Sequence, residues 1–117
     1  MREGSDQVQL IHCQQLVSFD NDMRAIGEER HQLAKDGSKM RLSAAGLVLL
    51  KKSLELVDSG EFDKLIVAFK EKNAHLAPRS REGKAVRSYL QGYERQADRC
   101  RKLAVDFRLP MVEPVST

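Results

Sequence analysis

A stripe of apolar residues in the C-terminal part of the chain constrains the fold more than any other feature. Its members follow one another at alternating steps of four and three residues: Val86, Leu90, Tyr93, Ala97, Cys100, Ala104 and Phe107. This spacing places all of them on one side of an α-helix and is typical of a helix that packs lengthwise against another helix. The central members are small, so a second helix can approach closely. The stripe therefore predicts a helical packing seam.

Four segments have helical periodicity, at about residues 6–35, 42–57, 61–75 and 80–109. They are separated by residues that commonly begin or end helices: Ser5, Asp6, Gly37, Gly60, Pro78 and Ser80. We expect Ser5 or Asp6 to cap the first helix and Ser80 to cap the fourth, because a hydroxyl or carboxylate oxygen accepts a hydrogen bond from the free N–H groups of the first turn. No segment alternates apolar and polar residues as a strand would.

These segments predict an all-α protein that forms one domain over residues 1–117, a small bundle of about four helices with long first and last helices. Short connections favour antiparallel neighbours. The second helix is apolar on most sides, so we expect it at the centre of the bundle. Residues 1–5 are expected to be flexible, and residues 110–117 to be extended because Pro110 and Pro114 cannot continue a helix.

The composition favours a homodimer. Aromatic residues make up only 5% of the chain, so the core of one subunit is thin and association would bury more apolar surface. The candidate dimer seam consists of members of the stripe: Val86, Ala97, Cys100 and Ala104. Monomeric bundles use the same spacing, so the sequence leaves open whether the seam lies within one chain or between two.

No catalytic, metal or cofactor motif is present in the sequence. The three histidines are scattered over different segments, and the spacings of zinc and calcium sites are absent. We therefore expect no enzyme activity, no catalytic residue, no metal and no cofactor. Two sparse cysteines suit the reducing cytoplasm, and the longest apolar run, 47–50, is far too short to span a membrane.

The surplus of apolar helix surface favours binding to another protein. Large aliphatic and aromatic side chains usually dominate such interfaces, and arginines steer the approach of an acidic partner. The candidate partner-binding residues lie on the last helix and in the tail: Leu90, Tyr93, Arg95, Arg99, Phe107, Leu109, Met111 and Val112.

A nucleic-acid-binding transcriptional regulator is the alternative. Residues 70–108 carry eleven Lys and Arg against five Asp and Glu, and six polar residues form a ridge along the last helix: Lys84, Arg87, Gln91, Arg95, Arg99 and Lys102. Such a ridge can lie along phosphates. A helix-turn-helix around residues 58–60 is disfavoured, because its second helix begins with Glu61 and Asp63, which repel phosphate oxygens.

The overall build and the apolar-Pro-apolar end, Phe107-Arg108-Leu109-Pro110-Met111-Val112, resemble the small all-helical antiactivators with which bacteria silence LuxR-type quorum-sensing regulators, the TraM- and QslA-like proteins. The resemblance rests on build, and it transfers no functional residue to a named position. It implies a cytoplasmic homodimer without a cofactor. Such a protein is a negative regulator that binds a transcription factor and blocks its dimerisation or its contact with DNA.

Overall fold

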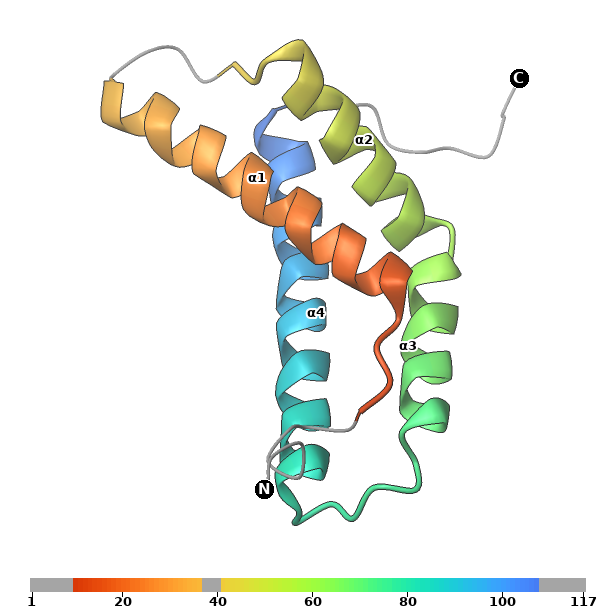
Figure 1. Ribbon diagram of the computed structural model, residues 1–117. Helices are drawn as coiled ribbons and strands as arrows, with labels where there is room; N and C mark the ends of the chain where they lie inside the picture. The colour runs from red at the N-terminus through yellow and green to blue at the C-terminus, as the bar shows by residue number, and fades with distance from the viewer. Residues whose placement is uncertain (1–9, 37–40, 108–117) are drawn as a thin grey trace, which may run out of the picture.

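The computed structural model describes residues 10–36 and 41–107. These residues form four α-helices and no strand: α1 (Gln14–Asp36), α2 (Ala44–Asp58), α3 (Glu61–Lys72) and α4 (Arg81–Asp106) (Figure 1). The predicted all-α bundle with long first and last helices is confirmed. Predictions about residues 1–9 and 108–117, including the caps at Ser5 and Asp6, lie outside the described residues.

Serine caps set the start of two helices. The Ser43 hydroxyl accepts a hydrogen bond from the backbone N–H of Gly46 at 3.0 Å, and the Ser80 hydroxyl accepts one from Gly83 at 3.0 Å. The predicted cap at Ser80 is thus confirmed. Between α2 and α3, Gly60 adopts a φ of 91°, a left-handed conformation that residues with a Cβ rarely enter. The glycine therefore permits the tight turn between α2 and α3, after which α3 continues toward the lower end of the molecule (Figure 1).

The first helix begins later than the sequence predicts. Residues 10–13 are not helical, although they continue the apolar pattern of α1. The reason is a distant side chain: the amide of Asn73 hydrogen-bonds both backbone groups of Ile11 and holds this segment outside the helix. The third helix ends at Lys72 and not near residue 75, because the chain turns at Asn73.

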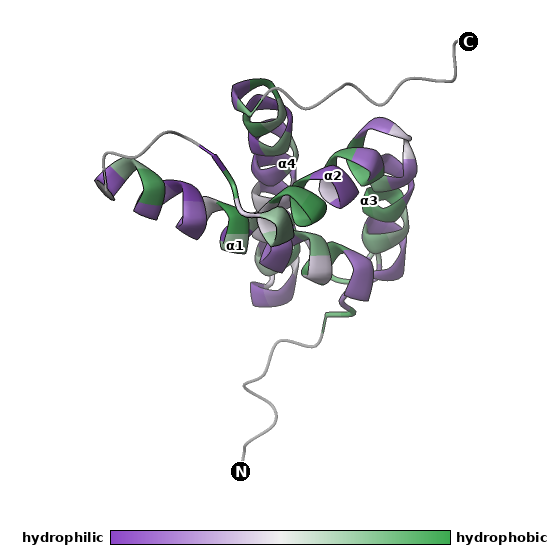
Figure 2. Ribbon diagram, turned by 90° about the horizontal axis from the view of Figure 1, so that it is seen from above, coloured by the Kyte–Doolittle hydropathy of each residue, from purple (hydrophilic) through white to green (hydrophobic). Residues whose placement is uncertain are grey.

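The core lies around α2, which packs against all three other helices, as its apolar composition predicts. Its start is tied to α1 by Glu29, whose carboxylate accepts hydrogen bonds from the Ser43 backbone N–H at 2.6 Å and from the Ser43 hydroxyl at 3.1 Å. Figure 2 shows apolar residues where the helices meet and hydrophilic residues along their outer sides.

The stripe on α4 is buried within one chain. The four residues of the candidate dimer seam are between 0% and 9% exposed: Val86, Ala97, Cys100 and Ala104. Since α4 packs against α1 and α2, the small side chains permit the close approach of helices of the same subunit. The structure therefore places these four residues at contacts within one chain, one of the two arrangements that the sequence leaves open. The homodimer itself stays a prediction.

Candidate functional site

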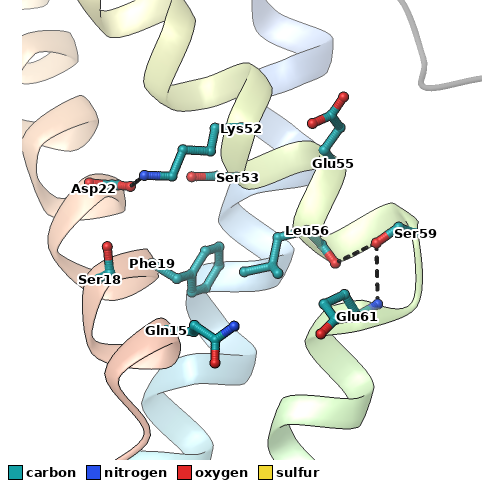
Figure 3. Close-up of a pocket in the computed structure, with 10 residues that line it drawn as sticks. All are labelled: Gln15, Ser18, Phe19, Asp22, Lys52, Ser53, Glu55, Leu56, Ser59 and Glu61. Atoms are coloured by element: carbon teal, nitrogen blue, oxygen red, sulfur yellow. Dashed lines mark hydrogen bonds and ion pairs between the residues drawn. The ribbon is translucent and has the colours of Figure 1, made fainter.

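A groove of about 740 Å³ lies between α1 and α2 and reaches the start of α3. Figure 3 shows the residues that line it. They are Gln15, Ser18, Phe19, Asp22, Lys52, Ser53, Glu55, Leu56, Ser59 and Glu61. The volume falls within the range of about 300–1,000 Å³ that is usual for ligand-binding pockets.

The floor of the groove is apolar. Phe19 from α1 and Leu56 from α2 point toward one another across it (Figure 3). Phe19 is held from behind by Phe62, whose ring centroid is 5.3 Å away. The neighbouring side chains of Ser18 and Ser53 are too short to fill the space between the two helices. An apolar side chain from a ligand would therefore find both a hollow and an apolar floor.

Ser53 is the unusual residue of this floor. It is only 2% exposed, and its hydroxyl has no hydrogen-bond partner among the described residues. A buried hydroxyl loses the hydrogen bonds that water makes to it in the unfolded chain. Without a new partner, this loss costs about 1–3 kcal/mol. Serine within a helix often bonds to the carbonyl four residues earlier, but this one does not. The Ser53 hydroxyl is therefore a buried polar group whose hydrogen-bonding capacity is unused within the described residues.

The rim of the groove is acidic. Lys52 Nζ lies 3.1 Å from Asp22 Oδ2, an ion pair that bridges α1 and α2 at one end (Figure 3). Glu55 and Glu61 are exposed, and neither forms an ion pair with another described residue. Three carboxylates and one ammonium group thus lie around an apolar floor. This combination is complementary to an apolar side chain that is flanked by Lys or Arg.

The candidate partner-binding residues of α4 do not form a binding surface of this kind. Tyr93 is 3% exposed and packs in the core, edge-on to Phe69 at 5.9 Å between ring centroids. Burial, and secondarily the nearby charge of Asp20, raises the pKa of Tyr93 above its ordinary value of 10.0. Leu90 and Phe107 are half-buried and pack against the core.

The other candidate partner-binding residues fall into two groups: arginines on the surface of α4, and residues of the tail that lie outside the described ranges. Arg95 and Arg99 are exposed. Leu109, Met111 and Val112 lie outside the described residues. Tyr93 offers almost no surface to a partner, because its ring is already covered by the subunit's own core.

The predicted arginines take part in a second groove of about 490 Å³, between α1 and α4. Arg95, Arg99 and Lys102 line it, and within the described ranges none of the three forms an ion pair. The Arg99 guanidinium lies against α1 at Gly27, where a Cβ would come within 2.8 Å of it. Asp20 on the opposite wall is already engaged by Arg24 at 2.8 Å. This groove is cationic, in contrast to the first.

Cys100 is fully buried, and burial, with a smaller contribution from Asp58, raises its pKa to about 12. The thiol is therefore neutral at physiological pH and packs as a small apolar side chain. In the part of the chain that the structure describes, no three His, Cys, Asp or Glu side chains are placed to hold a metal ion. Nor is any helix within those ranges long and apolar enough to cross a membrane.

Comparison with known proteins gives no relative from which to transfer a function. No protein-family model matches the chain, and the searches of curated proteins and of solved structures found no match either.

Proposed function

We propose that this protein is a regulator that acts by binding another protein through the groove between α1 and α2. The observation that supports the proposal is the combination of an apolar floor, formed by Phe19 and Leu56, with an acidic rim. The segment that binds there presents a large apolar side chain between basic residues, in the manner of an amphipathic helix in a groove. The protein itself catalyses no reaction in this proposal and needs no cofactor.

The partner that fits this chemistry best is a transcription regulator. Proteins that bind DNA carry basic surfaces, since they neutralise phosphates with Lys and Arg. An acidic-rimmed groove is complementary to such a surface and, by covering it, prevents contact with DNA. This agrees with the resemblance to the quorum-sensing antiactivators. The proposal therefore is a cytoplasmic negative regulator of a LuxR-type transcription factor. Both cysteines are free, as is usual in that compartment.

Two substitutions on α2 test the proposal. Leu56→Asp places a charge on the floor of the groove, whereas Val48→Asp makes the same change at a residue that is 63% exposed and does not line the groove. Tagged forms of the wild type and both variants are purified from the host, and co-purifying proteins are identified by mass spectrometry. We expect the wild type and Val48→Asp to retain a transcription regulator that Leu56→Asp loses. Equal recovery with all three folded forms would contradict the proposal.

The rim is tested separately by charge. Glu55→Lys reverses a charge at the groove, and Glu28→Lys makes the same change in net charge at an exposed position on α1 that does not line the groove. Binding to a basic partner should weaken in Glu55→Lys and persist in Glu28→Lys. The difference should shrink at high salt, because exposed charges are screened.

Nucleic-acid binding is the second candidate, and the cationic groove between α1 and α4 supports it. Arg95, Arg99 and Lys102 line that groove without an ion pair in the described part of the chain. Binding to phosphates releases counterions, so the affinity would fall steeply with salt. We expect no retarded duplex band at physiological salt. Tight retardation that disappears in an Arg95→Glu, Arg99→Glu variant would favour this candidate over protein binding.

A further inference from the structure

The segment of residues 10–13, here called the strap, extends from the start of α1 alongside α3 and α4 (Figure 1). It is bound by Asn73, the residue that follows α3, and the ring of His12 lies edge-on against Tyr89 of α4, with 5.1 Å between ring centroids. Leu10 is 9% exposed and belongs to the core. The strap thus occupies a slot whose walls are provided by two helices.

Asn73 recognises the backbone of the strap. Its Oδ1 accepts a hydrogen bond from the Ile11 N–H at 2.7 Å, and its Nδ2 donates to the Ile11 carbonyl at 2.9 Å. A further bond from Nδ2 to the Phe69 carbonyl, also 2.9 Å, fixes the orientation of the amide. An extended chain pairs with a neighbouring strand through the same donor and acceptor of one residue. The side chain of Asn73 therefore imitates one rung of a β-ladder.

The slot buries the side chain of Leu10 but leaves that of Ile11 largely exposed. Leu10 is buried, whereas the Ile11 side chain is 47% exposed although both of its backbone groups are bound. The slot therefore selects an apolar residue at the first position and tolerates many residues at the second. Backbone hydrogen bonds that give affinity and an alternating pocket that gives specificity are the features of extended-peptide recognition.

The slot also requires an occupant. Asn73 is 4% exposed, and only the strap pairs with its Oδ1 among the described residues. Removing the strap would leave this buried polar atom without its partner and would expose the socket of Leu10, both of which cost free energy. An extended segment from another molecule satisfies the same groups.

We propose that the slot between α3 and α4 is a second peptide-binding site, which takes an extended apolar segment of a partner protein, and that the strap is its resident competitor. The strap is attached to the fold, so its effective concentration at the slot is high and it keeps the site closed to weak ligands. A partner segment with a large apolar residue followed by a residue with free backbone groups displaces it. This second site rests on the proposed function, because its ligand is also part of a partner protein. It uses the slot between α3 and α4 and not the groove between α1 and α2.

The test is the binding of a labelled peptide with the sequence of residues 7–13, in which Ser replaces Cys13, to the full-length protein. Fluorescence anisotropy reports the affinity. Leu10→Asp releases the strap from its socket and leaves the slot intact. Ile11→Asp is the matched control, because the same change at an exposed side chain keeps the strap in place.

We expect the peptide to bind Leu10→Asp at least about 10-fold more tightly than it binds the wild type or Ile11→Asp, because the competitor is gone. The double variant Leu10→Asp, Asn73→Ala should lose this gain. Absence of binding to a Leu10→Asp variant that retains the wild-type circular dichroism would overturn the proposal.

Hydrogen exchange in the wild type gives the answer if Leu10→Asp does not fold. A saturating concentration of the peptide should accelerate exchange of the Ile11 amide, because displacement breaks its bond to Asn73. An unchanged exchange rate of the Ile11 amide would overturn the proposal. Dissociation of a wild-type dimer by the peptide would also overturn it, because the slot would then be occupied by the strap of a second copy of the protein. The groove between α1 and α2 plays no part in these measurements, so their failure leaves the proposed function standing.

Discussion

Replacing Ser53 with alanine should stabilise the protein, although Ser53 is among its most buried residues. The hydroxyl has no hydrogen-bond partner among the described residues, so its removal relieves a desolvation cost of about 1–3 kcal/mol. Alanine also has the higher helix propensity, by about 0.5 kcal/mol. The lost oxygen leaves a small void beside an existing groove, which offsets at most about 1 kcal/mol. We therefore expect a net gain of about 0.5–3.5 kcal/mol in the free energy of unfolding.

Thermal and urea unfolding followed by circular dichroism measure this gain. For a domain of this size each kcal/mol raises Tm by about 4 °C. The control is Ser88→Ala, because Ser88 is exposed within α4 and its replacement changes helix propensity alone. A loss of stability in Ser53→Ala would refute the reasoning, since it would mean that the hydroxyl is satisfied by a hydrogen bond in solution. A gain no larger than that of Ser88→Ala would mean that burial of the hydroxyl costs nothing.

Three further predictions concern the core and its assembly. Asn73→Ala should lower the free energy of unfolding by about 2–3 kcal/mol, measured with urea, because three hydrogen bonds of a buried amide are lost together; an unchanged value would show that the strap is not bound in solution. Ala97→Glu should unfold the subunit and not merely dissociate a dimer, since position 97 is 4% exposed within one chain. The predicted homodimer is tested separately by light scattering of the wild type. A monomeric mass at micromolar concentration would exclude it. Burial raises the pKa of Cys100 in the folded state to about 12 from an ordinary 9.0. The contribution of this thiol to the free energy of unfolding should therefore be complete below pH 9 and be lost between pH 9 and about 12. Cys100→Ala should reduce the fall of stability over this pH range, and an equal fall in the variant would contradict the raised pKa.

The helices could be predicted from the sequence because their signals are local. Four-three spacing defines the apolar side of α4, and a serine at the start of a helix supplies its own cap at Ser80. The same spacing specifies that a helix packs against α4 but not which chain provides that helix. The structure places the residues of the candidate seam between helices of one subunit, which the spacing alone could not decide.

The strap and the groove depend on contacts that are distant in the sequence. Leu10 and Ile11 continue the apolar pattern of α1, and only a side chain 62 residues away keeps them out of the helix. In the groove, the signal that sequence reasoning missed is Ser53, the polar residue on the otherwise apolar buried side of α2. The position of Ser53 on α2 indicates that this side of the helix is buried. The groove itself depends on the packing of α1 against α2, which places Phe19 and Leu56 opposite one another.

Site-specific photo-crosslinking in the living host is the most direct test of protein binding through the groove between α1 and α2. A photoreactive phenylalanine analogue is introduced at position 56, on the floor of the groove, or at position 48, which is exposed on the same helix outside it. After irradiation, adducts are separated by mass and identified by mass spectrometry. We expect a single adduct with a transcription regulator from position 56 and none from position 48. Equal adducts from both positions, or an adduct from position 48 alone, would contradict binding through the groove.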